Sequence, residues 1–367
     1  MSRIVIDARE SGSSTGRYVD ELIRYLHKLA PAHEFIILTK SERLPFMAQT
    51  VPNFKAVAAD YKEFTFAEQL GLKKLIESQQ PDLVFFPAAQ QPVWYRGKVV
   101  TTIQDLTTVR FRNPEKNPLV FWLKLQVYKW VIKQVTRKST AVITPSQFVK
   151  DDTAQFTGID PSKITVTYEA ADVFADVPQP IDNFVGKDFI MFNGRPLPHK
   201  NLRRVIEAFA VLSVQYPNLY LMLAGKKNSS QVGYVALADK LGIGDKVILT
   251  DWITDGQLKW AMQHTKAYIY ASLSEGFGLP PLEAMLYGAP VVSSNATCMP
   301  EVLGDAVHYF NPTDVHDMAT KIAEVLDDPV LREELIEKGA KQVKKYSWKH
   351  MAEQTLVVFE KALRQAN

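Results

Sequence analysis

The sequence predicts an α/β protein with two doubly wound parallel sheets. Short β-branched or apolar runs alternate with longer segments of helical period through both halves of the chain, which is the pattern of repeated βαβ units. A length of 367 residues is sufficient for two domains, each with its own core. Two prolines flank a polar residue at Val177-Pro178-Gln179-Pro180 and interrupt both periodicities, so we place the domain boundary there.

The expected strands share a short, β-branched or aromatic apolar character and lie between helical segments. In the first half they are Ile4–Asp7, Glu34–Thr39, Leu83–Phe86, Val99–Gln104, Ala141–Thr144 and Ile164–Thr167. In the second half they are Phe189–Asn193, Tyr220–Ala224, Val247–Leu249, Ala267–Tyr270, Val291–Ser293 and His308–Phe310. Each half therefore supplies enough strands for one sheet.

The composition is that of a globular protein, with 46% apolar and 23% charged residues. No run approaches the roughly 18 apolar residues that span a bilayer, and the first residues resemble a strand more than a signal peptide. We therefore expect a cytoplasmic protein. The single cysteine, Cys298, cannot form an internal disulfide or a zinc cluster, and we expect it in the core.

A glycine loop between a strand and a helix carries the strongest chemical signal, within residues 270–285. Gly276 and Gly278 have no Cβ atom, so a ligand can approach the backbone closely. Two prolines then suit the first turn of a helix, whose amino terminus favours an anion. We therefore predict a phosphate pocket at this loop.

Two carboxylates accompany the loop. Glu283 is expected in the first helical turn, where it could merely complement the helix dipole on an exposed face. That interpretation does not explain Glu275, which lies eight residues earlier, at the end of the strand and next to Gly276.

The segment resembles the paired-glutamate motif of the retaining glycosyltransferases of the GT4 family, which have the GT-B fold. The resemblance continues through Phe192-Asn193-Gly194-Arg195, His199-Lys200-Asn201, Leu223-Ala224-Gly225, Thr250-Asp251-Trp252, residues 299–305 and Tyr346-Ser347-Trp348. It implies two doubly wound, Rossmann-like domains facing across a cleft that holds the active site. Residues 1–180 would bind the acceptor, residues 181–345 the nucleotide sugar, and residues 346–367 would form a helix that crosses back to the first domain.

The resemblance also implies roles for individual residues. Glu275 would lie against the hexose hydroxyls and Glu283 would bind the ribose hydroxyls. The loop that contains Gly16 would close over the donor phosphates, with Arg17 a weaker candidate. The remaining residues expected on the donor side are Gly194, Gly225, Trp252, Gly276, Phe277, Gly278 and Leu279.

Two cationic residues, Arg195 and Lys200, lie in the loop that follows one expected strand. Ligands bind beyond the carboxyl ends of the strands in doubly wound sheets. The resemblance assigns both to the donor diphosphate, whose developing charge fixed cations would stabilise. The alternative is that they are solvated loop residues. The neighbouring His199 is expected to form a local hydrogen bond or to face solvent, and we do not expect it to act as a base.

The chain departs from the family at Gln104. Members usually have histidine and then aspartate at these two positions, and here glutamine precedes Asp105. Gln104 cannot take up a proton, although it can bind a sugar hydroxyl. Retaining members are generally described as reacting on the front face of the donor, with the leaving phosphate accepting the proton, which needs no imidazole. Asp105 would orient the acceptor or would simply cap the following helix.

No metal or cofactor is expected. The sequence contains no Asp-x-Asp and no cluster with metal-ligand spacing, so the loop, the helix terminus and the two cations would take the place of a metal. The sugar nucleotide, with GDP-mannose the best candidate, is a substrate.

The segment 119–138 is an expected helix with a broad apolar arc and basic polar positions. In one interpretation its apolar residues pack on the first sheet. A second interpretation is compatible with the first and adds contact between the helix and anionic lipid. It is supported by a local excess of eight positive charges between residues 110 and 150. The contact residues would be Trp122, Lys129, Trp130, Lys133 and Arg137. No nucleic-acid-binding module accompanies this basic stretch.

Taken together, these features favour transfer of a hexose, with retention, from a sugar nucleotide to a lipid-linked or glycan acceptor. The sequence around Gly276–Glu283 is most similar to that of bacterial mannosyltransferases of glycolipid or polysaccharide assembly. Together with the basic helix, this resemblance implies peripheral contact at the inner face of the cell membrane. One alternative is a UDP-sugar-dependent glucosyl or N-acetylhexosaminyl transferase. Another is a catalytically weak sugar-nucleotide-binding subunit of a glycan-assembly complex, which Gln104 favours. A sugar-nucleotide epimerase or a phosphorylase on the same fold is a further alternative, but the sequence lacks the lysine setting for pyridoxal phosphate that a phosphorylase needs.

Overall fold

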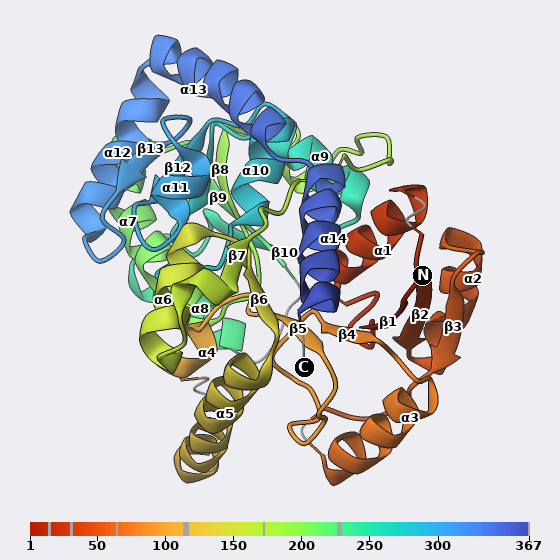
Figure 1. Cartoon of the computed structure of the whole chain (residues 1–367). Helices are drawn as coiled ribbons and strands as arrows, with labels where there is room; N and C mark the ends of the chain where they lie inside the picture. The colour runs from red at the N-terminus through yellow and green to blue at the C-terminus, as the bar shows by residue number, and fades with distance from the viewer. Residues whose placement is uncertain are drawn as a thin grey trace. The chain divides into compact units, whose positions relative to one another are not determined.

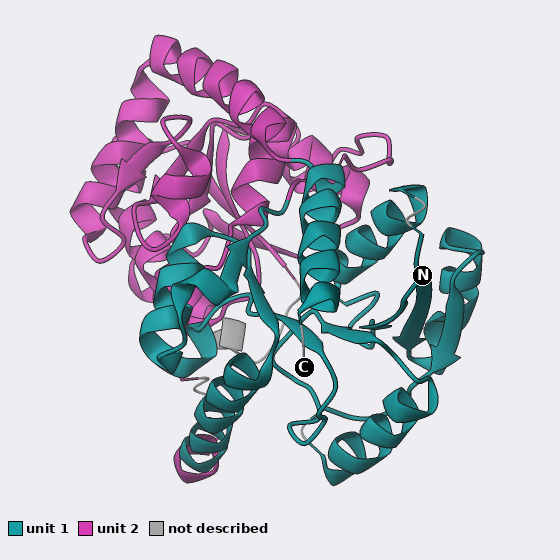
Figure 2. Ribbon diagram, viewed as in Figure 1, with its two compact units in different colours: residues 1–109, 122–169, 347–367 teal, residues 110–121, 170–346 magenta. Residues whose placement is uncertain are grey.

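The computed structural model describes residues 1–13, 16–29, 32–63, 65–112, 117–171, 173–225 and 230–365. The chain forms two compact units, shown in different colours in Figure 2. Unit 1 comprises residues 1–109, 122–169 and 347–367, and unit 2 comprises residues 110–121 and 170–346. Each unit has its own parallel sheet, as Figure 1 shows.

The sheet of unit 1 has seven strands in the order β3-β2-β1-β4-β5-β6-β7, all paired in parallel. The strands are β1 (Arg3–Asp7), β2 (Glu34–Thr39), β3 (Lys55–Ala58), β4 (Leu83–Phe86), β5 (Val99–Thr102), β6 (Ala141–Thr144) and β7 (Ile164–Val166). The α-helices of this unit are α1 (Arg17–Leu29), α2 (Leu44–Thr50), α3 (Lys73–Ser78), α4 (Thr107–Arg110), α5 (Pro118–Lys138, whose first turn is grouped with unit 2), α6 (Gln147–Thr157) and α14 (Trp348–Arg364).

The central strands of unit 1 are buried on both faces, because helices cover both sides of a parallel sheet. All residues of β4 and β5 are buried, which explains their nearly continuous apolar sequences. At the other extreme, β3 is a short edge strand whose two end residues are exposed. An edge strand needs no long apolar run, and for this reason the sequence did not reveal it.

The sheet of unit 2 has six parallel strands in the order β10-β9-β8-β11-β12-β13. The strands are β8 (Phe189–Asn193), β9 (Tyr220–Ala224), β10 (Val247–Asp251), β11 (Ala267–Tyr270), β12 (Val291–Ser294) and β13 (His308–Phe310). The α-helices are α7 (Leu202–Gln215), α8 (Ser230–Lys240), α9 (Asp255–His264), α10 (Leu279–Leu286), α11 (Met299–Leu303), α12 (Val315–Asp327) and α13 (Pro329–Gln342).

Both sheets are doubly wound, which confirms the predicted fold class. The strand order reverses between β1 and β4 in unit 1 and between β8 and β11 in unit 2. At such a switch point the loops that follow neighbouring strands run in opposite directions, and ligands bind beyond the carboxyl ends of the strands there. In unit 2 these loops are the two that contain the predicted cations and the predicted glutamate.

The carboxyl-terminal helix, α14, packs within unit 1. The ring of Phe359 lies 5.1 Å from the ring of Phe85 in β4, measured between centroids. At the end of the helix, Lys98 Nζ donates to the carbonyl oxygen of Leu363 (2.7 Å). Within the described parts of the chain, no helix combines the length and the apolar character needed to cross a bilayer.

Candidate functional site

The glycine loop follows β11 and leads into α10. Gly278, the N-cap of α10, has a φ of +100°, and a Cβ atom there would lie 2.7 Å from Met299 Cε. The positive φ favours glycine at this position, and any larger residue would also displace the end of the Met299 side chain. The loop is fixed from a neighbouring segment, because the backbone N–H of Glu275 donates to Thr297 Oγ1 (3.3 Å) and the thiol of Cys298 donates to the Glu275 carbonyl (3.3 Å). Cys298 is fully buried, as expected.

The cationic loop follows β8, forms a short 3-10 turn over Pro198–Lys200, and continues into α7. Asn201, which lies between them, has a left-handed conformation with a φ of +62°. Its buried amide donates to the carbonyl oxygen of Ala271 (3.2 Å), and the Leu273 N–H donates to the carbonyl oxygen of His199 (2.7 Å). These bonds hold the two loops together at the switch point of unit 2.

The two loops bring Lys200 and Glu275 into direct contact. Lys200 Nζ lies 2.6 Å from Glu275 Oε1, and the side chains are only 17% and 14% exposed. Lys200 Nζ also lies 5.4 Å from the ring centroid of Tyr270. Burial would raise the pKa of Glu275, but the charge and hydrogen bond of Lys200 hold this pKa below its ordinary value. The carboxylate is therefore ionised at neutral pH.

Arg195 does not join this ion pair. Its side chain is exposed, and it pairs with no carboxylate in the described part of the chain. It nevertheless follows the same strand, β8, as Lys200. His199 is half-buried, and burial lowers its pKa, so its ring is neutral at pH 7.

The prediction that Glu283 lies in the first helical turn is wrong. Because α10 begins at Leu279, Glu283 falls in the second turn, and the side chain is buried. The helix dipole acts mainly within the first turn, so dipole compensation on an exposed face does not explain this carboxylate. A buried carboxylate is retained where polar partners or a ligand stabilise it.

Three further residues predicted on the donor side also follow strands of unit 2. The N–H of Gly194 donates to the carbonyl oxygen of Ala224 (3.1 Å), and a Cβ atom on Gly225 would lie 2.9 Å from the carbonyl oxygen of Gly194. These two glycines therefore let the ends of β8 and β9 approach closely. Trp252 is 72% exposed and follows the edge strand β10, which β9 separates from β8.

The predicted residues of unit 1 follow β1 and β5. Gly16 is buried, and a Cβ atom there would lie 1.9 Å from the carbonyl oxygen of Glu10, so packing alone requires glycine. Residues 14–15 of the same loop lie outside the described residues. β5 ends at Thr102, two residues earlier than expected, so Gln104 and Asp105 lie in the loop beyond it.

The two side chains in that loop have different surroundings. Gln104 Nε2 is buried and has no hydrogen-bond partner among the described residues. Asp105 Oδ1 accepts from the backbone N–H of Thr107 (2.8 Å) at the start of α4, which is the capping bond that the alternative interpretation predicts.

Comparisons with known proteins place the chain in a family. Residues 156–342, half of the chain, match the family Glycosyl transferases group 1, and residues 15–173 match Glycosyltransferase Family 4. The chain is a group 1 glycosyltransferase. This confirms the resemblance that the paired glutamates indicated.

Relatives of this group 1 glycosyltransferase include proteins described as mannosyltransferases. The serotype-specific mannosyltransferase WbdA of Escherichia coli is 34% identical over 180 residues, which are 48% of this chain and 22% of WbdA. The O-antigen chain mannosyltransferase RfbU of Salmonella typhimurium is 26% identical over 340 residues, 88% of this chain and 90% of RfbU. The chain thus spans about a fifth of the length of WbdA but nearly all of RfbU.

Solved structures confirm the GT-B class of the fold. Sucrose-phosphate synthase from Thermosynechococcus elongatus superimposes with a TM-score of 0.78 at 15% identity, covering 98% of this chain and 99% of that one. Anabaena HepE in complex with UDP-glucose gives a TM-score of 0.74 at 17% identity, covering 98% and 100%.

Sequence reasoning missed three residues of this glycosyltransferase near the predicted positions. Tyr268 and Tyr270 are buried on one face of β11, which precedes the loop of Glu275, and burial raises the pKa of both hydroxyls well above the ordinary value. Their signal was the alternation of tyrosines before the glycine loop. In unit 1, Glu169 follows β7 and is buried, and burial raises its pKa to about 7 despite the opposing charge of Arg17. A lone glutamate gave no signal in the sequence.

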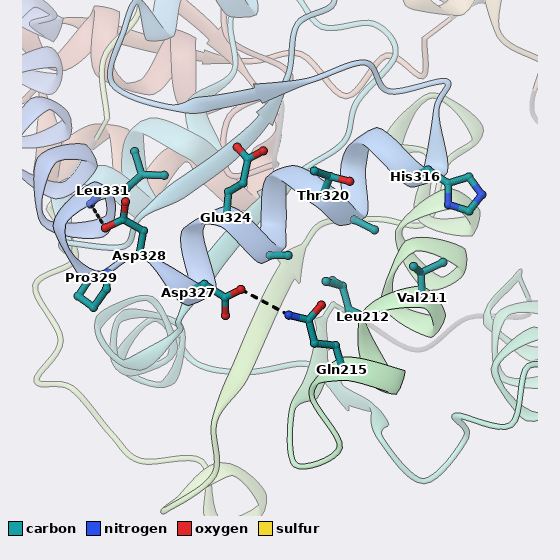
Figure 3. Close-up of a pocket in the computed structure, with 12 residues that line it drawn as sticks. Val211, Leu212, Gln215, His316, Thr320, Glu324, Asp327, Asp328, Pro329 and Leu331 are labelled. Atoms are coloured by element: carbon teal, nitrogen blue, oxygen red, sulfur yellow. Dashed lines mark hydrogen bonds between the residues drawn. The ribbon is translucent and has the colours of Figure 1, made fainter.

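A separate hollow of about 700 Å³ lies between α7 and α12 of unit 2 (Figure 3). Two of its lining residues are linked, because Gln215 Nε2 donates to Asp327 Oδ2 (3.4 Å). The described residues that line the hollow include none of those predicted for the donor site. The hollow is therefore not part of the candidate site.

Proposed function

We propose that this group 1 glycosyltransferase moves mannose, with retention, from GDP-mannose to a lipid-linked or glycan acceptor without a catalytic metal. The observation that carries the proposal is the Lys200–Glu275 ion pair beside the glycine loop at the switch point of unit 2. The printed descriptions of WbdA and RfbU as mannosyltransferases support mannose as the sugar.

The proposed chemistry assigns a separate task to each charged group. Lys200, with Arg195 from the same loop, stabilises the negative charge that develops on the departing diphosphate. The Glu275 carboxylate, kept ionised by Lys200, accepts hydrogen bonds from the hexose hydroxyls. A charged hydrogen bond contributes about 1.5–3 kcal/mol, so the loss of Lys200 would slow transfer by about ten- to 150-fold.

The proposed transfer needs no protein base at Gln104. The bond between the sugar C1 and the diphosphate oxygen breaks, and the acceptor oxygen bonds to C1 on the same face. The acceptor proton passes to the leaving diphosphate. Gln104 can donate its buried amide N–H groups to a sugar hydroxyl, and Nε2 has no partner among the described residues that would compete.

The surface of α5 supports an acceptor held at a membrane. An exposed apolar stripe runs along the helix at spacings of three and four residues, whereas Ile132 and Val135 are buried on the core side. The helix contains four lysines and one arginine but no acidic residue. Apolar and cationic groups on one helix fit the surface of an anionic bilayer. The stripe comprises Leu119, Trp122, Leu123, Val127 and Trp130.

A vesicle experiment tests this contact. We expect the protein to sediment with vesicles that contain phosphatidylglycerol, and we expect the double change Trp122→Ser and Trp130→Ser to reduce the bound fraction at least fivefold. Val214→Ser, which alters an exposed apolar residue of unit 2, should have no effect. Equal binding by both variants would contradict a role for α5.

UDP-sugars are the second candidate donors, because HepE, which has the same fold, was solved with UDP-glucose. A transfer assay separates the candidates. The purified protein is incubated with GDP-mannose, UDP-glucose or UDP-N-acetylglucosamine and with a lipid-linked acceptor, and the anomeric configuration of the product is read by NMR. We expect an α-mannoside from GDP-mannose. Transfer from a UDP-sugar alone would replace the donor, and neither transfer nor hydrolysis of any donor would favour a non-catalytic subunit.

A further inference from the structure

A second polar hollow lies in unit 1, at the amino ends of β5, β6 and β7. It has a volume of about 720 Å³ and is open to solvent. Five cations line it, from four separate segments of the chain, and no Asp or Glu is among the described residues that line it. The cations are Arg96, Lys98, Lys138, Lys163 and Lys361.

The half-buried lysines of this hollow are held by neutral groups. Their ammonium groups donate to backbone carbonyl oxygens, which satisfy hydrogen bonds but carry no full negative charge. The bonds run from Lys138 Nζ to the oxygens of Pro92 (2.6 Å) and Val93 (3.3 Å), from Lys98 Nζ to those of Leu363 (2.7 Å) and Gln365 (2.6 Å), and from Lys163 Nζ to that of Arg137 (2.8 Å).

Arg96 and Lys361 are exposed and pair with no carboxylate in the described part of the chain. Asp160, which lies close by in sequence, is not a lining residue, and its Oδ1 accepts from the backbone N–H of Ser162 (2.8 Å). The hollow therefore concentrates positive charge that the described carboxylates do not balance.

The burial of Lys138 and Lys163 favours the binding of an anion in the hollow. Burial lowers the pKa of Lys138 to about 8 and also lowers that of Lys163, because a desolvated ammonium without a counter-charge is costly. An anion that enters the hollow would supply the missing charge. Several cations from different segments suit a multivalent anion better than a single carboxylate.

This hollow is separate from the residues predicted for catalysis in the same unit. It lies at the amino end of β5, whereas Gln104 and Asp105 follow the carboxyl end. The four residues of β5 separate the two ends by about 13 Å. A ligand in the hollow would therefore not occupy the predicted acceptor position.

We propose that the hollow at the amino ends of β5–β7 binds a phosphate-bearing anion. The ligand chemistry is a phosphate or diphosphate group, which either a free phosphorylated compound or the headgroup of an anionic lipid can provide. Trp94, which precedes the lining residue Arg96 by two positions, is exposed.

The first arm of the test uses pyrophosphate in isothermal titration calorimetry. All proteins carry Lys200→Ala, which weakens anion binding at the predicted donor site. We expect Arg96→Ala with Lys361→Ala to lower the affinity for pyrophosphate at least about tenfold. Arg96→Lys with Lys361→Arg should retain it. Lys240→Ala, an exposed lysine of unit 2, is the matched control.

The second arm measures sedimentation with phosphatidylcholine vesicles that contain or lack phosphatidylglycerol. If the alanine pair reduces binding to the anionic vesicles, the source is a lipid headgroup. If it reduces only pyrophosphate binding, the source is a free phosphorylated compound. Thermal unfolding verifies that each variant is folded, which is expected because neither Arg96 nor Lys361 forms an ion pair in the described structure. If the alanine pair and Lys240→Ala behave alike in both arms, the proposal is overturned.

Discussion

At the residue scale, the ionised state of Glu275 depends on its neighbours. Burial opposes the charge, and Lys200, at 2.6 Å, more than compensates for it. The ring of Tyr270 lies beneath the same ammonium. A cation over an aromatic face contributes about 0.5–2 kcal/mol, more where water is excluded. Tyr270 is therefore expected to position Lys200.

The role of Tyr270 can be tested with two substitutions. Tyr270→Phe retains the ring and should keep transfer within about threefold of the original rate, whereas Tyr270→Leu should lower kcat about tenfold. Tyr270→Leu should also raise the KM for the donor, because Lys200 would lose its support. Steady-state kinetics would measure both values. Equal losses in the two variants would show that the ring does not position Lys200.

The buried Glu169 predicts a pH dependence of stability. Burial raises its pKa in the folded chain to about 7, above the ordinary 4.5 that the unfolded chain retains. The folded state therefore binds the proton more tightly, and the free energy of unfolding falls as the pH rises from about 4.5 through 7. Glu169→Gln removes this decrease.

Urea unfolding at pH 5 and pH 8.5 measures the effect. The gain in unfolding free energy from Glu169→Gln should be about 2–3 kcal/mol larger at pH 8.5 than at pH 5. Glu42→Gln changes an exposed carboxylate of the same unit and should show no such difference. A gain from Glu169→Gln that is independent of pH would contradict the raised pKa.

At the element scale, the two ends of α10 provide a matched pair of glycines. Gly278 and Gly288 both have a positive φ, +100° and +76°. A Cβ atom on Gly278 would lie 2.7 Å from Met299 Cε, whereas a Cβ atom on Gly288 would meet nothing within 4 Å. The first position is restricted by backbone conformation and by space, and the second by conformation alone.

Alanine substitutions should separate these two effects. Gly288→Ala should lower the free energy of unfolding by about 1 kcal/mol and leave donor binding intact. Gly278→Ala should cost about 2–3 kcal/mol and weaken donor binding, because Met299 and the glycine loop must shift. Chemical denaturation and nucleotide titration give both values. If the two variants lose the same stability, the close contact with Met299 is not important.

The elements that could be predicted were those with strong local patterns. Buried strands such as β4, for example, have continuous apolar sequences. β3 was missed because an edge strand is stabilised by pairing with β2 and not by its own apolar run. Glu283 was placed one turn too early because two prolines do not fix the first residue of a helix.

At the scale of the whole molecule, the two units carry different predicted tasks. Unit 2 contains the ion pair and glycine loop assigned to the donor, and unit 1 contains Gln104, Asp105 and α5 from Trp122 onward. The sequence predicted the residues that provide charge, because their types and spacing are local. It did not predict the contacts between distant segments by which Asn201, Tyr270 and Thr297 hold those groups in place.

The central claim is that the Lys200–Glu275 site of unit 2 binds a nucleoside diphosphate. Isothermal titration calorimetry with GDP and UDP tests it most directly, on the unchanged protein and on Lys200→Ala, Glu275→Gln and Lys240→Ala. We predict one nucleotide site with high affinity, tighter for GDP, that Lys200→Ala weakens at least about tenfold and that Lys240→Ala leaves unchanged. Glu275→Gln should weaken GDP-mannose more than GDP, because its proposed contact is with the sugar. Undiminished binding of both nucleotides to Lys200→Ala, or no binding to the unchanged protein, would contradict the claim.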